Sequence, residues 1–422
     1  MQLPSYFDVK GNGLVPSLCR LYYFMLQVLL LELRSTDKFR LTLRRAAIYT
    51  FFFCLLPTLM IWNHAGLYLD DILFPSWKTQ EIKQPLFLVG NARSGTTWLH
   101  RLITHDADRF ATFKSWELAF AVSVSWRYLF HSLYALDRLL GGAVYSTLMA
   151  IESHLVGHIH VHPIGLMEAE EDEWLMAHIA CAQLLLFFFP LGGSVINDLI
   201  LFDHGPMSAS TRRDVFHFYK QCVQRHMYYH ACRASVGRVS VPRFISKNPA
   251  FTLRLQTIYE TFPDARVVCL LRDPQQSIPS MISYISKVWH AFAEPVERYP
   301  DAQGLLGFCE AHYLYPLTQL CAPRAENTWD FLSYHLLLED LEGTVARLLL
   351  RLYGESVPGG AGDTGDTGSQ NAFRRFLRSE QSNARQYKTQ HMHSIQQCCG
   401  GMSEAELKGK LAEVYAKHSG AF

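Results

Sequence analysis

The 422-residue sequence predicts an α/β protein, in which a parallel sheet is flanked by helices. Residues 85–110 read as a short apolar strand, a glycine-containing loop and a helix. Further buried-strand patterns lie near 243–247, 266–271 and 329–338, each beside a helical stretch, as parallel sheets require. A large helical insertion separates the first strand from the others, and an apolar helical extension precedes the whole.

Residues 1–68 form this apolar extension, and we expect it to associate with a membrane. The run from Ala46 to Asn63 has no charged residue, and a helix of this length spans about 27 Å, enough for a thin bilayer. Basic residues just before the run would hold that end in the cytosol and place the rest in a lumen, the Golgi in a eukaryotic cell; they are Arg40, Arg44 and Arg45. Pro57 interrupts the run, so an interfacial hairpin or two helices buried in a dimer or core are the alternatives.

The loop after the first strand has the composition of an anion-binding site. Its residues are Gly90, Asn91, Ala92, Arg93, Ser94, Gly95, Thr96, Thr97 and Trp98. Glycines let the backbone turn tightly, and the N–H groups and dipole of a helix start bind phosphate oxygens. The loop is P-loop-like, but Thr96 stands where a triphosphate-binding loop has lysine, and Arg93 carries the charge instead. We therefore expect a ligand with one 5′-phosphate rather than ATP.

Two later strands also end in cations. Arg272 follows the strand at 266–271, and Ser280 lies eight residues on. Arginine binds phosphate with paired, charge-assisted hydrogen bonds, and a serine hydroxyl adds a donor. The alternative for Arg272 is a structural ion pair with Asp273. Lys247 ends the strand at 243–247, and its alternative is an ordinary solvated lysine.

In this order and spacing, the motifs resemble the sulfotransferases that use 3′-phosphoadenosine 5′-phosphosulfate (PAPS). The resemblance runs from about residue 69 to the strand at 329–341 and includes the segments 69–75 (LDDILFP), 116–117 (WE) and 168–174 (EAEEDEW). One departure stands out, because relatives often have a histidine shortly after the strand-end lysine, and Phe251 lies there in this chain.

The resemblance implies a role for each motif. The loop from Asn91 to Trp98 would bind the 5′-phosphosulfate. Arg272 and Ser280 would bind the 3′-phosphate. Arg93 and Lys247 would stabilise charge that develops on the bridging oxygen as the sulfuryl group leaves. No metal is required.

A base must take the proton from the acceptor, and Glu117 is the candidate. It lies 24 residues after Arg93, similar to the catalytic glutamate of carbohydrate and tyrosine sulfotransferases. The alternative is a buried glutamate paired with Arg101 or Arg127. Two further candidates, Glu170 and Glu171, are in an acidic run that equally suits a solvated helix N-terminus.

Composition limits the partners. The net charge is +1, from 39 basic and 38 acidic residues, and so lacks the excess of positive charge that is typical of nucleic-acid-binding proteins. Ten cysteines without C-x-x-C spacing read as thiols rather than a zinc site. Four histidines lack the partner pattern of a metal centre and are expected in an acceptor pocket or an aromatic layer: His154, His158, His160 and His162.

The expected organisation is the extension at 1–68 and a sulfotransferase-like domain at 69–422. Within the domain, 110–240 is a helical acceptor-binding insertion, 354–370 a flexible loop and 371–422 two C-terminal helices. Residues 174–191 are expected to form one buried helix. The predicted activity is transfer of a sulfuryl group from PAPS to a hydroxyl or amine of a lipid, glycan or other small acceptor. A kinase or nucleotide-binding switch, or an inactive membrane module, is the alternative.

Overall fold

The computed structural model divides the chain into two compact units. Unit 1 comprises Met1–Lys83, Asp108–Leu185 and Pro206–Ser246, and unit 2 comprises Gln84–Ala107, Leu186–Gly205 and Lys247–Phe422. The structure describes residues 9–34, 42–156, 165–189, 199–205, 207–237, 240–293, 302–321, 328–355, 368–386, 394–418, 420 and 422.

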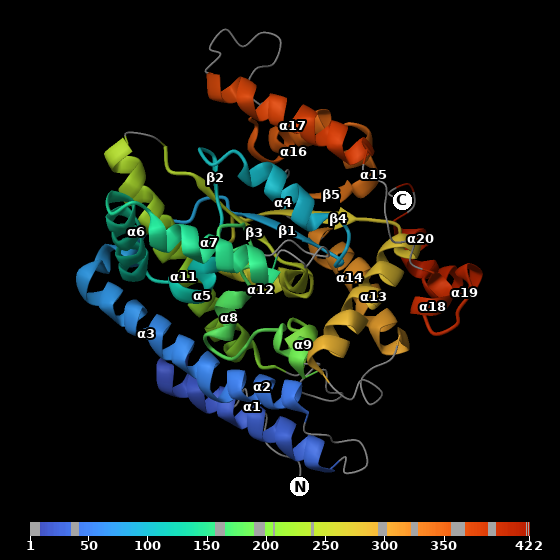
Figure 1. Cartoon of the computed structure of the whole chain (residues 1–422). Coiled ribbons are helices and arrows are strands. Elements are labelled where there is room, and N and C mark those ends of the chain that lie inside the picture. Colours follow the sequence, from blue (N-terminus) through green and yellow to red (C-terminus); the bar gives the residue numbers. More distant parts are fainter. Residues whose placement is uncertain are drawn as a thin grey trace. The chain divides into compact units, whose positions relative to one another are not determined.

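The described strand pairs are all parallel, which confirms the predicted α/β class. In unit 2, β4 (Arg266–Leu271) lies between β1 (Leu86–Gly90) and β5 (Trp329–Ser333). The short β2 (Phe110–Ala111) pairs with β3 (Arg243–Lys247). The strand order is β2-β3-β1-β4-β5 (Figure 1). Every residue of β1 is buried, and so is every residue of β4 after the first, as expected for apolar strands covered on both faces.

The last strand is shorter than predicted. It ends at Ser333, whose hydroxyl accepts a hydrogen bond from the His335 N–H at 3.3 Å and so caps the next helix, α15 (Tyr334–Glu339). The sequence after Ser333 is apolar enough for a strand, but the cap turns the chain into a helix.

Helices of unit 2 surround its strands. After β1 comes α4 (Thr96–Thr104), and after β3 come the 3₁₀ helix η4 (Pro249–Arg254) and α12 (Leu255–Thr261). The remaining helices follow β4 and β5, and they are α13 (Pro274–Phe292), α14 (Ala302–Leu320), α16 (Leu341–Tyr353), α17 (Gly368–Gln386), α18 (Ile395–Cys398), α19 (Glu404–Lys410) and α20 (Ala412–Lys417).

The prediction of two C-terminal helices was wrong, because α17 is followed by three short helices rather than one. Gly400 and Gly401 both have positive φ, 65° and 84°, and end the helical path. Ser403 then caps α19 in a capping box with Glu406. Most of the predicted loop at 354–370 lies outside the described residues.

Unit 1 is mainly helical, as expected for the insertion and the extension. Its helices are α1 (Leu14–Arg34), α2 (Leu43–Thr50), the π-helical turn η2 (Phe51–Leu55), α3 (Leu56–Leu73), η3 (Pro75–Thr79), α5 (Ser115–Phe120), α6 (Val124–Leu139), α7 (Ala143–Val156), α8 (Trp174–Ala177) and α11 (Ala209–Gly237). The single helix predicted at 174–191 was wrong. Ala180 has φ +54° and breaks it, leaving α8 and the separate α9 (Leu185–Phe188).

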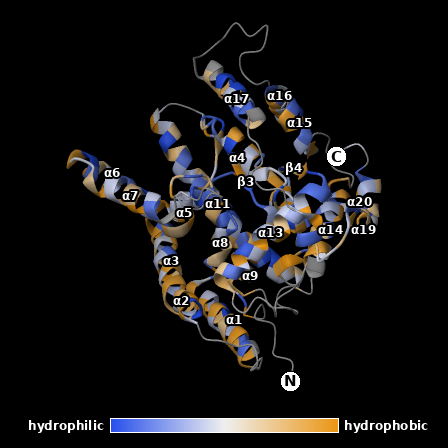
Figure 2. Cartoon of the chain, turned by 45° about the vertical axis from the view of Figure 1, so that its right-hand side comes forward, coloured by the Kyte–Doolittle hydropathy of each residue, from blue (hydrophilic) through white to orange (hydrophobic). Residues whose placement is uncertain are grey.

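The segments α2, η2 and α3 form one continuous helical stretch, Leu43–Leu73. It is longer than the predicted run because Pro57 does not break it. Pro57 lies in the first turn of α3, directly after the π-helical turn, where the missing N–H of proline costs little. By length and composition alone this stretch is apolar enough to cross a membrane. Figure 2 shows hydrophobic residues along α1, α2 and α3.

Candidate functional site

Two glycines and one arginine shape the loop between β1 and α4. Gly90 has φ +132°, and a Cβ there would lie 2.5 Å from the Leu270 carbonyl oxygen on β4. Gly95 has φ +94°, and its Cβ would lie 2.6 Å from the Tyr334 ring. Arg93 adopts φ +70° although it is not a glycine. Backbone strain of this kind costs free energy and is typical of functional loops.

The structure brings Arg93, Arg272 and Ser280 together within unit 2. The Arg93 Nε donates to the Ser280 Oγ at 3.2 Å, and the Arg272 Nη1 donates to the Arg93 carbonyl oxygen at 3.0 Å. The Arg272 guanidinium also lies 4.8 Å from the centre of the Tyr334 ring. The segments that follow β1 and β4 thus contact each other, because the Arg93 guanidinium meets the Ser280 hydroxyl on α13 and the Arg272 guanidinium meets the Arg93 backbone.

The predicted loop residues divide by burial. Asn91, Ser94 and Thr96 are buried, whereas Ala92, Arg93, Gly95, Thr97 and Trp98 are partly exposed. The Asn91 side chain donates to the Cys309 carbonyl oxygen at 3.3 Å, and Asn91 accepts from the Ser94 N–H through its backbone. The buried residues therefore hold the loop, and the partly exposed ones can reach a ligand.

Lys247 is 1 % exposed, which contradicts the alternative of a solvated surface lysine. Its charge acts on His100, which lies on α4. The pKa of His100 is well below the usual value, first because of burial and then because of the neighbouring Lys247 and Arg101 cations. The strand-end lysine therefore lies close to the helix that follows the anion-binding loop.

Sequence reasoning missed Thr252 and Tyr334. The Thr252 hydroxyl bonds to both the N–H and the carbonyl oxygen of Gly90, at 2.8 and 3.1 Å, and fixes the end of β1. The Tyr334 ring fills the space beside Gly95 and contacts Trp98 with ring centres 6.3 Å apart. The sequence could have indicated Thr252, because it is a threonine in the apolar segment that follows β3. It could not have indicated Tyr334, because the contact of Tyr334 with the loop depends on the strand order.

The start of α13 is supported by distant tyrosines. The Tyr313 hydroxyl donates to the Arg272 carbonyl oxygen at 2.7 Å, and the Ser277 and Tyr313 hydroxyls are 2.6 Å apart. The Tyr415 hydroxyl donates to Asp273 at 2.8 Å, so α20 also helps to hold this turn. Asp273 caps α13 by accepting from the Gln275 N–H at 2.9 Å. No Arg272–Asp273 ion pair is among the described contacts.

Glu117, the predicted base, is in unit 1 and is 6 % exposed. One carboxylate oxygen accepts from the Lys114 N–H at 2.8 Å, as part of a capping box at the start of α5. The other lies 3.7 Å from Nη1 of the fully buried Arg127. The expected pairing with Arg127 is therefore present, and a capping function is added. Neither contact tests the catalytic role.

The acidic run contains a side chain that is more deeply buried than the predicted candidates. Glu170 and Glu171 are partly exposed and precede α8. Asp172 is 1 % exposed and accepts from the Ser246 hydroxyl on β3 at 3.0 Å and from the Tyr219 hydroxyl on α11. Asp172 therefore has a structural function that the sequence did not indicate.

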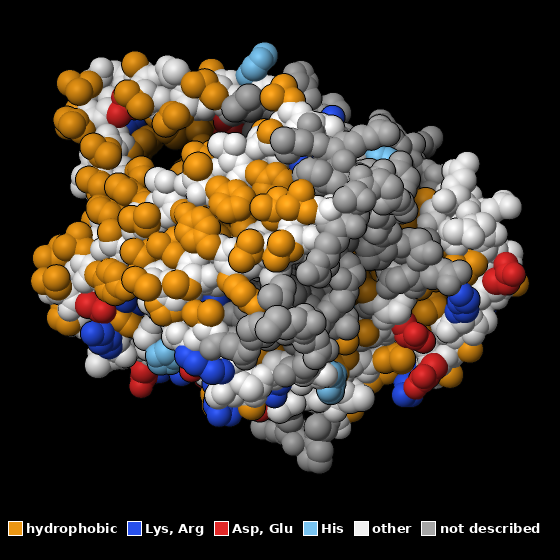
Figure 3. Space-filling model, turned by 90° about the horizontal axis from the view of Figure 1, so that it is seen from below, with side chains coloured by type: hydrophobic (Ala, Val, Ile, Leu, Met, Phe, Trp, Pro, Cys, Tyr) orange, Lys and Arg blue, Asp and Glu red, His pale blue; other side chains and the backbone are white. Residues whose placement is uncertain are grey.

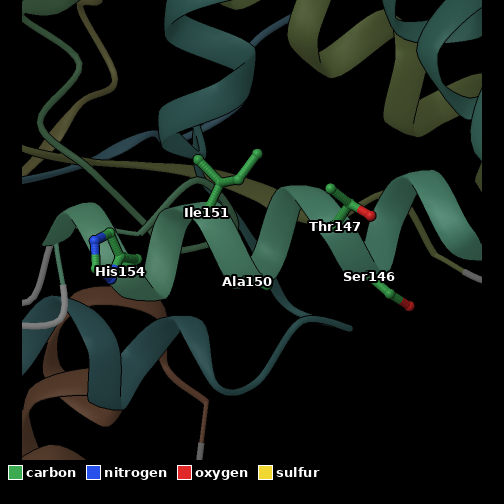
Figure 4. A pocket seen from close by; sticks show the side chains of 5 residues that line it. All are labelled: Ser146, Thr147, Ala150, Ile151 and His154. Atoms are coloured by element: carbon green, nitrogen blue, oxygen red, sulfur yellow. The ribbon is translucent and has the colours of Figure 1, made fainter.

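Among the residues that the structure describes, no three histidine, cysteine, aspartate or glutamate side chains gather as a metal site. His158, His160 and His162 lie outside that part of the chain. Figure 4 shows His154 on α7, beside an open hollow of about 510 Å³ lined by Ser146, Thr147, Ala150, Ile151 and His154. None of the predicted donor-site residues lines it.

Comparisons with known proteins identify the family and the fold. The sequence model of the sulfotransferase family matches residues 85–355. Sulfotransferase STF9 from Mycobacterium avium is 15 % identical, with 93 % of this chain and 96 % of that chain covered and a TM-score of 0.63. Sulfotransferase STF1 from Mycobacterium tuberculosis H37Rv is 18 % identical, with 88 % and 87 % covered and a TM-score of 0.62.

At these identities the two structures show a shared fold. No curated protein matches the sequence. The family match covers more than half of the chain and contains the loop after β1, the strand-end lysine and the turn after β4. The chain therefore belongs to the sulfotransferase family.

Proposed function

We propose that this protein transfers a sulfuryl group from PAPS to a hydroxyl or amine of a lipid or glycan acceptor. The observation that carries the proposal is the contact between the two loops. Arg93 bonds to Ser280 through its side chain and to Arg272 through its carbonyl oxygen, and this contact supports the proposal that both segments bind one ligand. A nucleotide with separate 5′- and 3′-phosphates needs cations from two such loops.

The residues around the loop suit a transferring sulfuryl group. The N-terminus of α4, which has nine residues, contributes backbone N–H groups and the positive end of its dipole. Arg93 and the buried Lys247 stabilise the charge that grows on the leaving phosphate oxygen. In-line transfer of this kind depends mainly on positioning and electrostatics, as phosphoryl transfer does. Thr96 stands in the place of the lysine that an ATP-binding loop requires, which disfavours a kinase.

Nucleotide binding tests the donor directly. Thermal unfolding measured with 3′-phosphoadenosine 5′-phosphate (PAP) should show a rise in melting temperature that ATP with magnesium does not give. A larger rise with ATP and magnesium would reject the sulfotransferase proposal in favour of a kinase. A rise with neither nucleotide would favour an inactive relative.

Transfer of radiolabelled sulfate to lipid and glycan extracts tests the acceptor and the base. Glu117→Gln keeps an oxygen that accepts from the Lys114 N–H, so the cap of α5 should survive while proton removal fails. We expect PAP binding within a factor of about two and a loss of turnover of about a hundredfold or more. Normal turnover in the Glu117→Gln variant would remove Glu117 from the role of base.

A further inference from the structure

The first helix of unit 1 buries polar side chains and exposes only apolar or aromatic ones among the residues whose burial is described. Four polar residues of α1 are 0–8 % exposed, namely Ser17, Arg20, Gln27 and Glu32. Every residue of α1 that is described as exposed or half-exposed is apolar or aromatic, and the most exposed are Val15, Tyr22, Leu26 and Leu33. A surface helix in water shows the opposite distribution.

The stretch α2–η2–α3 repeats this inversion. Four strongly polar residues of this stretch are buried, namely Arg45, Asn63, His64 and Asp70, whereas Arg44 and Asp71 near its two ends are exposed. Its exposed residues between positions 46 and 70 are uncharged, and they are Ala47, Thr50, Cys54, Leu55, Thr58, Ile61, Ala65 and Tyr68. The hydroxyls of Thr50 and Thr58 donate back to the carbonyl oxygens four residues earlier, at 2.9 and 2.8 Å. Such internal bonding is what a polar group requires in lipid.

The two inverted helices form an antiparallel hairpin. Near one end the Leu14 N–H donates to the Tyr68 hydroxyl at 3.3 Å, and farther along the Tyr22 hydroxyl donates to the Phe53 carbonyl oxygen at 3.3 Å. At the other end Arg45 pairs with Glu32, and both side chains are fully buried. The pair keeps two opposite charges inside the hairpin, away from its outer surface.

The hairpin face is the outer surface made by the exposed residues of α1 and of residues 46–68. Figure 3 looks onto the lower side of Figure 1, where these helices lie, and hydrophobic side chains cover much of its described surface. An open hollow of about 460 Å³ runs along α1 and is lined by Val15, Leu18, Cys19, Tyr22, Tyr23 and Leu26. Contiguous apolar surface of this kind marks an interaction site.

We propose that the hairpin lies in the plane of a membrane, with the hairpin face in the lipid of one leaflet, and does not cross the bilayer. The buried side of α3 is bonded to the rest of unit 1, which prevents a span. Asn63 donates to the Ala119 carbonyl oxygen at 2.9 Å, Asp70 accepts from the Val124 and Ser125 N–H groups at 2.8 Å, and Trp62 donates to the Phe120 carbonyl oxygen at 2.8 Å. A spanning helix would have lipid in place of these partners.

Lipid suits this face better than a protein partner. Protein interfaces contain about one hydrogen bond per 100–200 Å², and so need polar groups that can reach across. On the hairpin face the threonine hydroxyls donate to carbonyl oxygens of their own helix. The structure buries the charged residues that it describes at positions 14–32 and 45–70. An interfacial helix pair binds through its buried apolar area. The proposal does not depend on sulfuryl transfer.

Vesicle flotation tests membrane binding in the full chain. Purified protein is mixed with vesicles of equal parts phosphatidylcholine and phosphatidylglycerol, and should float with them. The double variant Leu26→Asp, Leu55→Asp changes two residues that are 50 and 56 % exposed, so folding should persist. Its partitioning should fall about tenfold or more, because aspartate is strongly disfavoured in lipid. Leu350→Asp, at 55 % exposure in unit 2, is the matched control and should bind normally.

Three exposed native cysteines report on orientation. Cys19 and Cys54 lie on the hairpin face, whereas Cys321 is in unit 2. Vesicles should protect the first two from a water-soluble maleimide and leave Cys321 reactive. A fluorophore on Cys54 should be quenched more by lipids brominated near the headgroup than by lipids brominated at the chain end.

Other results would overturn the proposal. Failure of the wild type to float, with a dimer in solution, would assign the face to a second copy of the chain. Strongest quenching from the bilayer centre would make α2–α3 a membrane span. Equal loss of flotation in Leu350→Asp would show that the effect is not specific to the hairpin face.

Discussion

Replacing Arg272 should remove most of the affinity that a 3′-phosphate adds to a nucleotide. A guanidinium has five N–H donors. In this structure one Nη1 donor is used by the Arg93 carbonyl oxygen at 3.0 Å, and Nε points to the Gln276 side chain at 3.4 Å. The remaining donors, on Nη1 and Nη2, suit a paired contact with phosphate oxygens.

The size of the effect follows from that count. Two charge-assisted hydrogen bonds contribute about 1.5–3 kcal/mol each, or about 3–6 kcal/mol together. This corresponds to a loss in affinity of about a hundredfold at the least. Titration calorimetry with PAP and with adenosine 5′-phosphate isolates the contribution, because only PAP has the 3′-phosphate. For Arg272→Ala, the affinity for PAP should fall to nearly that for adenosine 5′-phosphate, and the latter should change little.

Arg272→Lys and Arg378→Ala complete the design. The lysine variant keeps the charge without the planar pair of donors, so its affinity for PAP should be intermediate. Arg378 is an exposed arginine of unit 2 that pairs with Glu342, and its removal should leave binding of both nucleotides unchanged. If Arg272→Ala weakens both nucleotides equally, the residue acts by holding the loop through Arg93, and the assignment to the 3′-phosphate fails.

Gly90→Ala should lower the free energy of unfolding by about 2 kcal/mol or more, because φ +132° is strained for alanine and the new Cβ would meet a carbonyl of β4. Gly307→Ala is the control in the same denaturant titration, and it should be neutral or stabilising because there is open space around Gly307. Thr252→Val should cost about 1–3 kcal/mol, since the Gly90 N–H loses its partner, and an unchanged urea midpoint would contradict this. Burial lowers the pKa of His178 and of His312 to about 4. The unfolded chain, in which a histidine has a pKa of about 6.5, therefore binds more protons than the folded protein as the pH falls below that value. Each histidine should thus lower the free energy of unfolding by about 2 kcal/mol between pH 7 and pH 5. Stability that stays flat over this range would refute the burial of both.

The strand, loop and helix from β1 to α4 were predictable from the sequence because their constraints are local. A strand pattern, glycines and Arg93 lie within a few residues, and Arg272 directly follows a second strand pattern. The same holds for the parallel sheet, whose apolar strands are short and continuous. These features depend on residue type and spacing alone, so they can be predicted without knowledge of the tertiary structure.

What the sequence did not reveal depends on distant contacts. Tyr334 packs beside Gly95 although 239 positions separate them, and no periodicity indicates such a contact. In the sequence Arg45 is among the basic residues that precede the apolar run, whereas in the structure Arg45 pairs with Glu32 inside the hairpin. Short helices in the C-terminal segment arise from positive-φ glycines, and sequence does not decide whether a glycine adopts that conformation.

The division into units separates the two halves of the proposed reaction. The loop after β1, Lys247, Arg272 and Ser280 are all in unit 2, whereas Glu117 and the hairpin face are in unit 1. Nucleotide affinity therefore reports on unit 2 and vesicle binding on unit 1, and only transfer requires both. Suppose that a variant of the hairpin face keeps PAP affinity and transfer to a soluble acceptor but loses transfer to a lipid acceptor. Membrane binding would then give access to the acceptor and would not be needed to maintain the fold. This outcome follows only if donor binding and membrane binding are independent, as their separate residues indicate.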